Sequence, residues 1–159
     1  MIEIPNELLD RIKTHGEQSY DEECCGALFG NYSDEIKTIY DIHEFENEKQ
    51  ENRQNRFLIS PAQYKLAEKL AKEKGFELLG FYHSHPDHPA IPSQFDTDHA
   101  LPWFLYIIVS VNKAKAETLT VWILKEDRSR FEEQQVSVSA RASLSGETLV
   151  KPDASARRV

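Results

Sequence analysis

Hydrophobic residues along this chain occur in short runs separated by polar turns, and the period of each run predicts its structure. Apolar residues recur at helical spacing between residues 6 and 16, so we expect a short first helix that ends near Gly16. Residues 24–29 and 36–42 are rich in apolar, β-branched and aromatic types, and a polar turn separates them. These two runs predict the strands of a hairpin.

The second half of the pattern combines further strands with one clear helix. Ser60 and Pro61 are typical N-cap and first-turn residues, apolar residues then recur at helical spacing, and Gly75 is a typical helix end. The remaining predicted strands cover residues 57–59, 76–83, 104–111 and 118–124. Strands outnumber helices, but helices separate several of them, so the pattern predicts an α/β or α+β fold, a mixed sheet with helices on its faces.

Length and composition predict one domain. The chain has 159 residues, close to the ~150 of an average domain, and residues 1–140 hold every predicted element. Residues 44–56 are almost wholly polar, which predicts a mobile loop that could cover a site. Residues 141–159 carry few large apolar side chains and predict a flexible tail.

Charge and apolar content argue against nucleic acids and membranes as partners. The formal net charge of −8 repels phosphate backbones. The longest apolar run, residues 101–111, contains Pro102 and is far shorter than the ~20 residues that span a membrane. No signal-peptide pattern follows Met1, and the adjacent Cys24 and Cys25 cannot form a relaxed disulfide with each other, so we expect a cytoplasmic protein in a reducing compartment.

The candidate chemistry lies between residues 83 and 99, which hold four of the six histidines. His83 and His85 are two positions apart at the end of a predicted strand, so both imidazoles lie on one face of the sheet. Without a further ligand, the pair fits a hydrogen-bonded pair at a strand end equally well. A proline-rich loop (Pro86, Pro89 and Pro92) then forbids continued sheet pairing and leads to Ser93-x-x-Asp96, a helix capping pattern. Two histidines and one aspartate leave a fourth position open, the composition of a catalytic zinc site rather than a structural one.

The same segment and the two cysteines also suggest three other enzyme classes. Residues 83–88 spell H-x-H-x-D-H, the dinuclear motif of the metallo-β-lactamase fold, but no histidine follows His99 to complete that site. The amidohydrolase barrels also begin with H-x-H, yet a barrel needs ~250 residues. Cys24 and Cys25 together with a histidine suggest a thiol protease. Their place in an apolar strand predicts core packing instead.

Two segments of the chain together resemble the JAMM/MPN metallopeptidase family. Residues 23–30 (ECCGALFG) match the E-x-C-G-x-L-x-G of its bacterial and archaeal members, a register that selects Glu23 rather than Glu22. Residues 83–86 (HSHP), followed by the serine and aspartate of Ser93-x-x-Asp96, match the rest of its signature. The resemblance covers roughly residues 5–125, is closest to the short prokaryotic members, and implies an MPN-like, largely antiparallel mixed sheet with cytidine-deaminase-like layering.

The resemblance also implies roles for individual residues. His83, His85 and Asp96 would bind one Zn²⁺ per chain, with water in the fourth position. Glu23 would be the general base that takes the proton of this water and passes it to the leaving amine. Ser93 would donate a hydrogen bond to the carbonyl oxygen as its negative charge develops.

Other polar residues near the motif match no required family position. Ser84 is expected to support the loop, and His88, Asp98 and His99 are expected to be surface or supporting residues. The JAMM type of site thus implies a hydrolase whose catalytic and metal-binding residues are limited to the five named above.

The implied activity is hydrolysis, by a zinc-dependent peptidase or isopeptidase, of the bond after the C-terminus of a ubiquitin-like or sulfur-carrier protein. Two family branches fit less well: the linkage-specific deubiquitinases need a second zinc site with His and Cys, and the DNA-repair branch has Asn at the position of Ser84. The chain has neither Cys nor His after His99. Two alternatives remain, a non-catalytic MPN scaffold and a JAMM-type cell-wall or phage-tail peptidase. A scaffold would usually lack a ligand, and an exported peptidase would usually carry an export signal or a second domain.

Overall fold

The computed structural model describes residues 1–46 and 59–140. Within these ranges the helices are α1 (Asn6–Ser19), α2 (Pro61–Glu73) and α3 (Gln94–His99). The strands are β1 (Ile2–Pro5), β2 (Cys25–Ser33), β3 (Ile36–Phe45), β4 (Glu77–Pro86), β5 (Leu105–Asn112), β6 (Lys115–Leu124), β7 (Phe131–Glu133) and β8 (Val136–Ser139). The predicted α+β fold is confirmed, and so is the predicted hairpin, because β2 and β3 pair in antiparallel.

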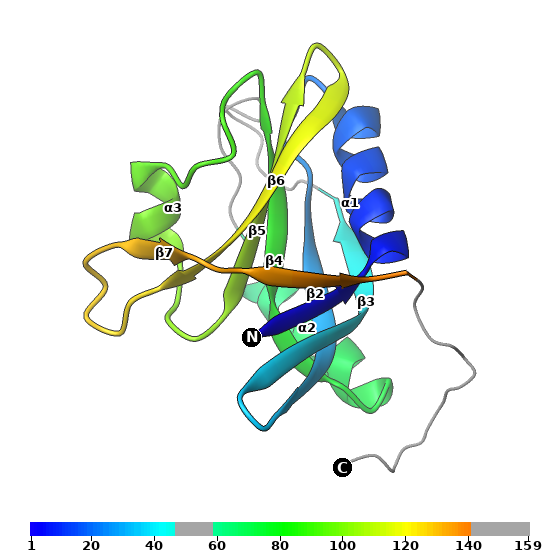
Figure 1. Cartoon of the computed structure of the whole chain (residues 1–159), viewed down its shortest axis with the longest axis vertical. Coiled ribbons are helices and arrows are strands. Elements are labelled where there is room, and N and C mark those ends of the chain that lie inside the picture. Colours follow the sequence, from blue (N-terminus) through cyan, green and yellow to red (C-terminus); the bar gives the residue numbers. More distant parts are fainter. Residues whose placement is uncertain (47–58, 141–159) are drawn as a thin grey trace.

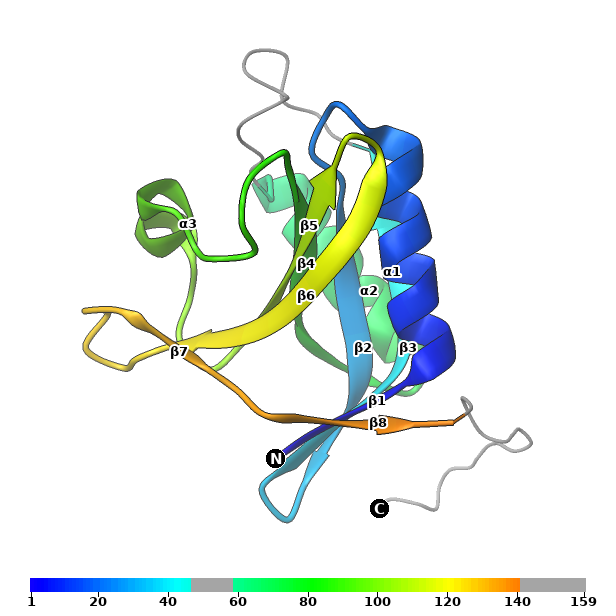
Figure 2. The same cartoon turned by 45° about the horizontal axis from the view of Figure 1, so that its top comes forward.

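All the described strands belong to one sheet, in the order β7-β6-β5-β4-β2-β3-β1-β8. Four neighbouring pairs are antiparallel, and β1 with β3, β1 with β8 and β4 with β5 are parallel. The two edge strands follow each other in the chain, so one extended segment runs from one edge of the sheet to the other (Figure 1). The sheet is therefore curled, and Figure 2 shows β6 bending around the inner strands.

Two helices cover opposite faces of this sheet. Neighbouring residues of a strand point to opposite faces, and in β4 Tyr82 packs in the same apolar cluster as Ile12 of α1. Phe81 packs instead with Ala67 of α2. The sheet is therefore buried on both sides along its central strands β2 and β4, which explains their nearly unbroken apolar sequences.

Helix α1 continues past Gly16, so the predicted end near this glycine is wrong. A Cβ atom at Gly16 would lie 3.0 Å from Cγ2 of Val111 and 3.4 Å from Cγ1 of Val109, both on β5. The glycine lets the helix approach the sheet closely instead of ending the helix, and α1 runs on to Ser19.

The proline-rich loop also begins one residue later than predicted. Pro86 is the last residue of β4 and lies in register with Val111 of β5. Proline has no backbone N–H to donate, but the next residue, Asp87, donates its N–H to the carbonyl oxygen of Val111 at 2.8 Å. A terminal proline is therefore compatible with this parallel pairing.

Several predictions fall partly or wholly on undescribed residues. The predicted strand 57–59 is described only at Ile59, which lies in no strand. Most of the predicted loop 44–56 and the whole predicted tail 141–159 lie outside the described residues, so the loop's role and the domain boundary at residue 140 stay predictions. Across the described ranges, no helix combines the length and the apolar composition needed to cross a membrane.

Candidate metal centre

The two motif histidines lie at the end of β4, on the sheet face that α2 covers further along the strand. Both are buried, with 2% of His83 and 8% of His85 exposed. Their Nε2 atoms are 3.1 Å apart, so the two imidazoles converge on one point, as the spacing of two residues predicts. Ser84 between them points to the other face and is fully buried.

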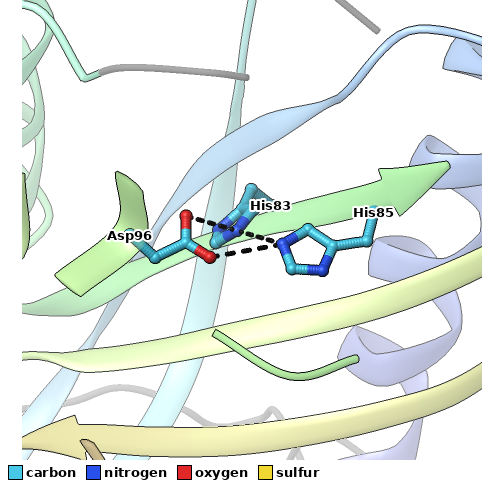
Figure 3. A group of neighbouring side chains, drawn as sticks. All are labelled: His83, His85 and Asp96. Atoms are coloured by element: carbon cyan, nitrogen blue, oxygen red, sulfur yellow. Dashed lines mark hydrogen bonds and ion pairs between the residues drawn. The ribbon is translucent and has the colours of Figure 1, made fainter. Parts of the chain in front are cut away.

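Asp96 reaches the same point from α3 (Figure 3). Its Oδ1 lies 3.2 Å from Nε2 of His83, and its Oδ2 lies 3.3 Å from Nε2 of His85. Ser93 is the N-cap of α3, as the S-x-x-D pattern predicts, and both bonds of a capping box are present. The Ser93 backbone N–H donates to Oδ2 of Asp96 at 2.8 Å and so fixes the carboxylate.

The three ligand atoms fit a small divalent metal ion. In a tetrahedral zinc site with bonds of about 2.0–2.1 Å, neighbouring ligand atoms lie roughly 3.3 Å apart. The nitrogen and oxygen atoms of His83, His85 and Asp96 are separated by 3.1 to 3.3 Å. Two nitrogens and one oxygen are one ligand short of a closed four-ligand site. Among the described residues, His83, His85 and Asp96 are the one cluster that could hold a metal ion, and no fourth side chain joins it. The donor set therefore suits an ion that keeps one position open for water or substrate.

The backbone fixes which nitrogen of His85 carries the proton. Nδ1 of His85 lies 2.8 Å from the carbonyl oxygen of Pro89. A carbonyl oxygen only accepts, so Nδ1–H is the donor and the lone pair of a neutral imidazole is left on Nε2. Metal-binding histidines are commonly oriented in this way.

Electrostatics keep the cluster in a metal-binding state. Burial lowers the pKa of His83, an effect that the charge of Asp96 opposes, so the neutral imidazole needed for binding is favoured. Burial raises the pKa of Asp96, but the influence of His83 and the hydrogen bonds with both histidines and with the backbone of Ser93 outweigh this. The net effect holds the pKa of Asp96 well below its usual range, and the carboxylate stays charged.

Glu23 is buried beside the cluster, with 5% of the residue exposed, whereas Glu22 is partly exposed. It precedes β2, in which Cys25 lies in register with His83. Burial raises the pKa of Glu23 to about 9, and the negative charge of Asp96 adds to the shift. The register of Cys25 with His83 brings the start of β2, and Glu23 just before it, to the end of β4 that carries the two histidines.

Ser84 fastens the segment that carries Glu23. Its hydroxyl oxygen accepts the backbone N–H of Cys24 at 2.8 Å, and its own N–H donates to the carbonyl oxygen of Cys24 at 3.1 Å. These bonds support the segment before β2, whereas the sequence predicts that Ser84 supports the proline-rich loop. Cys24 and Cys25 are free thiols, both buried, as expected for core residues.

Three hydroxyl groups that the sequence does not single out hold the loop between His85 and Ser93. Ser110 donates to the carbonyl oxygen of His88 and Thr120 to that of Ala90, each at 2.6 Å. Tyr20 donates to a carboxylate oxygen of Asp87 at 2.6 Å. These donors come from the C-cap of α1, from β5 and from β6, so no local sequence signal could have identified them.

Helix α3 is fixed from its other end by Arg128, which was also missed. The guanidinium donates to the carbonyl oxygens of Ala100 at 2.8 Å and Asp98 at 3.5 Å. His88 and Asp98 do not belong to the metal-binding cluster, and neither does His99, whose ring packs on Phe95 with centroids 4.1 Å apart. The prediction that all three are surface or supporting residues is consistent with these positions.

Comparisons with known proteins agree with this geometry. The family model of prokaryotic homologs of the JAB domain matches residues 5–125. A desampylase from Haloferax volcanii is 30% identical over 89 residues, which are 55% of this chain. The match spans 62% of that relative, less than two thirds of its length.

Three solved structures share the fold. A protein from Desulfitobacterium hafniense has a TM-score of 0.79 at 25% identity, with 90% of this chain and 96% of that chain covered. A protein from Salinibacter ruber has a TM-score of 0.68 at 37% identity, with 89% and 92% covered. A JAB1/MPN domain protein from Archaeoglobus fulgidus has a TM-score of 0.55 at 17% identity, with 87% and 97% covered, and this likeness concerns the fold alone.

Proposed function

We infer that this chain, which belongs to the family of prokaryotic JAB-domain homologues, is a zinc-dependent peptidase or isopeptidase. Its proposed substrates are conjugates of a ubiquitin-like or sulfur-carrier protein, cut after the C-terminus of that modifier. The observation that carries the proposal is the convergence of two buried Nε2 atoms and one carboxylate within 3.3 Å of one another. The similarity to a desampylase supports the removal of a protein modifier as the activity.

The proposed ligands of the metal are His83, His85 and Asp96. A zinc ion bound there would polarise the scissile carbonyl and lower the pKa of water, which makes a nucleophile available at neutral pH. Other divalent ions compete for a site with this donor set, so zinc itself is part of the proposal.

The proton transfers are assigned to Glu23. When the C–O bond forms and the C–N bond breaks, a carboxylate oxygen of Glu23 accepts a proton from the attacking water and then gives it to the leaving amine. A raised pKa makes the Glu23 carboxylate a stronger base than an exposed one. A zinc ion bound at the neighbouring ligands would favour the charged form of Glu23, which the first step needs.

Ser93 is assigned the stabilisation of the carbonyl oxygen. Its hydroxyl oxygen accepts the backbone N–H of Asp96 at 3.0 Å, and this leaves the hydroxyl hydrogen for another acceptor. Ser93 is also exposed, so a substrate can reach it. The same side chain can therefore cap α3 and donate to the oxygen on which negative charge develops.

An extended substrate tail can add to the sheet beside this site. β1 pairs with β3 only at Lys37 and Thr38, so among the described strands none pairs with the outer edge of β3 from residue 39 to residue 45. Phe45 on this edge lies in register with Cys25, which lies in register with His83. A tail paired there would gain main-chain hydrogen bonds about 14 Å from β4, three strand spacings away, and its end could extend from there toward the histidines.

Elemental analysis of the purified chain tests the metal assignment. We expect about one zinc per chain, lost in His85→Ala, and chelator-sensitive release of a reporter fused after the C-terminus of a ubiquitin-like protein. A folded chain that binds no metal even after zinc is added would contradict the proposal and favour the scaffold alternative.

Glu23→Gln separates catalysis from metal binding. The amide keeps the shape of the carboxyl group but cannot take a proton, so we expect kcat to fall by about 10²- to 10⁴-fold with the zinc content unchanged. Turnover at the wild-type level would exclude Glu23 as the general base.

A further inference from the structure

An apolar pocket of about 180 Å³ adjoins the candidate metal centre and shares two of its residues, His83 and Asp96. A cavity of about 150 Å³ lined by apolar side chains is large enough to bind benzene. The pocket can therefore take a phenyl ring or a branched aliphatic side chain next to the proposed reaction centre.

The walls of the pocket are mainly aromatic and come from five different elements. The aromatic lining residues are Tyr64, Phe81, Phe95, Tyr106 and Phe131. Their rings contact one another: Phe81 and Tyr106 have centroids 6.1 Å apart, and Tyr106 meets Phe131 edge to face at 5.8 Å. Such rings favour an apolar or aromatic occupant.

Two polar atoms of the walls are already engaged in hydrogen bonds, and no basic side chain of the described residues lines the pocket, which argues against an anionic occupant. The Tyr106 hydroxyl accepts the backbone N–H of Leu101 at 2.9 Å. Nδ1 of His99 is bonded to the carbonyl oxygen of Phe95 at 2.9 Å. No Lys or Arg is among the described residues that line the pocket.

The position of the pocket indicates which part of a substrate reaches it. Of the described residues that line it, none belongs to β2 or to the segment with Glu23, whereas α3 contributes Phe95, Asp96 and His99. In the proposed reaction the leaving amine faces Glu23, and the carbonyl oxygen faces Ser93 at the start of α3. The pocket thus lies on the acyl side of the scissile bond.

We propose that this pocket is a specificity subsite that binds one large apolar side chain from the last residues of the modifier, before the scissile bond. The proposal rests on the proposed function, because the acyl side is defined by the roles of Glu23 and Ser93. It adds a substrate requirement, since a tail composed only of small residues would leave the pocket unfilled.

The test uses zinc-loaded protein and a set of tail peptides that end in a fluorogenic amide. Each of the last four positions before the amide is changed in turn from Gly to Phe or Leu, and a second set places the same residues after the scissile bond. We expect a rise in kcat/KM of at least about tenfold at one position before the bond and none after it. A preference confined to positions after the bond, or found nowhere, would overturn the proposal.

Phe131→Ala and Phe76→Ala form a matched pair of variants. Both phenylalanines are partly buried and each contacts a tyrosine, Phe131 with Tyr106 and Phe76 with Tyr40, but only Phe131 lines the pocket. We expect Phe131→Ala to lower kcat/KM much more for the large-residue tail than for the all-glycine tail, so that most of the preference is lost, and Phe76→Ala to keep the preference. Equal losses on both peptides would show that Phe131 is only structural.

Binding measurements separate failure of the pocket from failure of the proposed function. The tail peptides, without a leaving group, are titrated into zinc-loaded Glu23→Gln protein and followed by nuclear magnetic resonance. Tighter binding of the large-residue tail without cleavage by the wild-type chain would support the pocket and contradict the peptidase. Cleavage of every tail with equal binding would support the peptidase and contradict the pocket.

Discussion

Two helices of this protein begin with the same local motif and use it differently. α2 starts at Ser60 and α3 at Ser93, and in both a capping box joins the serine to the third residue of the helix, Gln63 or Asp96. In α2 the side-chain amide of Gln63 is buried and also donates to the carbonyl oxygen of Glu46 at 2.8 Å. In α3 the equivalent carboxylate faces two histidines.

The surroundings of the two helices account for the difference. α2 has 13 residues and buries Ala67 and Ala71 against the sheet, so packing holds it in place. α3 has six residues and buries none of them, and it is fixed by its cap and by Arg128. The same box thus stabilises a packed helix in one place and positions a charged ligand atom in the other.

The largest expected effect comes from exchanging amide and carboxylate at the third residue of the two capping boxes. Asp96→Asn keeps an acceptor for the Ser93 N–H but removes the negative charge, so we expect loss of zinc and of cleavage. Gln63→Glu keeps the acceptor for Ser60 but places a carboxylate beside the carbonyl oxygen of Glu46, so we expect stability to fall by about 1–3 kcal/mol with zinc retained. Elemental analysis and thermal unfolding would check both, and zinc in Asp96→Asn protein at the wild-type level would contradict the ligand assignment.

A smaller effect is expected from removing the two cap hydroxyls. Ser60→Ala and Ser93→Ala each lose a helix cap, which costs about 1 kcal/mol. If Ser93 also stabilises the carbonyl oxygen, kcat of Ser93→Ala falls by about 10²- to 10³-fold with little change in KM. Steady-state kinetics of both variants would measure this difference, and Ser93→Thr, which keeps a hydroxyl group, is the control. An equal effect on kcat in Ser60→Ala and Ser93→Ala would show that Ser93 acts only as a helix cap.

The last prediction concerns stability alone and is a pH dependence in the metal-free protein. Burial, with the charge of Asp96 added, raises the pKa of Glu23 from its ordinary 4.5 to about 9. The folded chain then holds a proton that the unfolded chain releases, so this contribution to stability is fully present below about pH 4.5 and is lost as the pH rises through about 9.

Thermal unfolding in the presence of a chelator measures this dependence. We expect Tm to fall across that pH range in the wild type and to fall less in Glu23→Gln. Gln63→Ala is the control at the capping box of α2, because the amide of Gln63 does not titrate. This variant should lower Tm by a similar amount at every pH. An unchanged slope in Glu23→Gln would mean that the Glu23 carboxyl is not perturbed by burial.

Local patterns predicted the parts of the site that depend on spacing alone. The single residue between His83 and His85 places both rings on one face of a strand, whatever that strand pairs with. Ser93-x-x-Asp96 predicts a capped helix start, and both capping bonds are present. The hairpin of β2 and β3 and helix α2 follow from equally local signals, an apolar period and turn or cap residues.

Other elements needed partners that are distant in the chain. β1, β7 and β8 have three or four residues each, too few to show a period, and they exist because another strand offers backbone hydrogen bonds. The predicted end of α1 was wrong because the effect of Gly16 depends on its close approach to Val111 of β5. The predicted start of the proline-rich loop was wrong because Asp87 donates the backbone hydrogen bond that Pro86 cannot.

Residue types at fixed spacing were enough to predict the family, the fold class and the set of candidate ligands. Three features emerge only from the folded chain: the carboxylate meets both imidazoles, Glu23 is buried, and aromatic rings from five elements line a pocket at the cluster. The difference arises because spacing sets the direction of a side chain within one element. Distance, burial and charge between elements depend on how the whole chain packs.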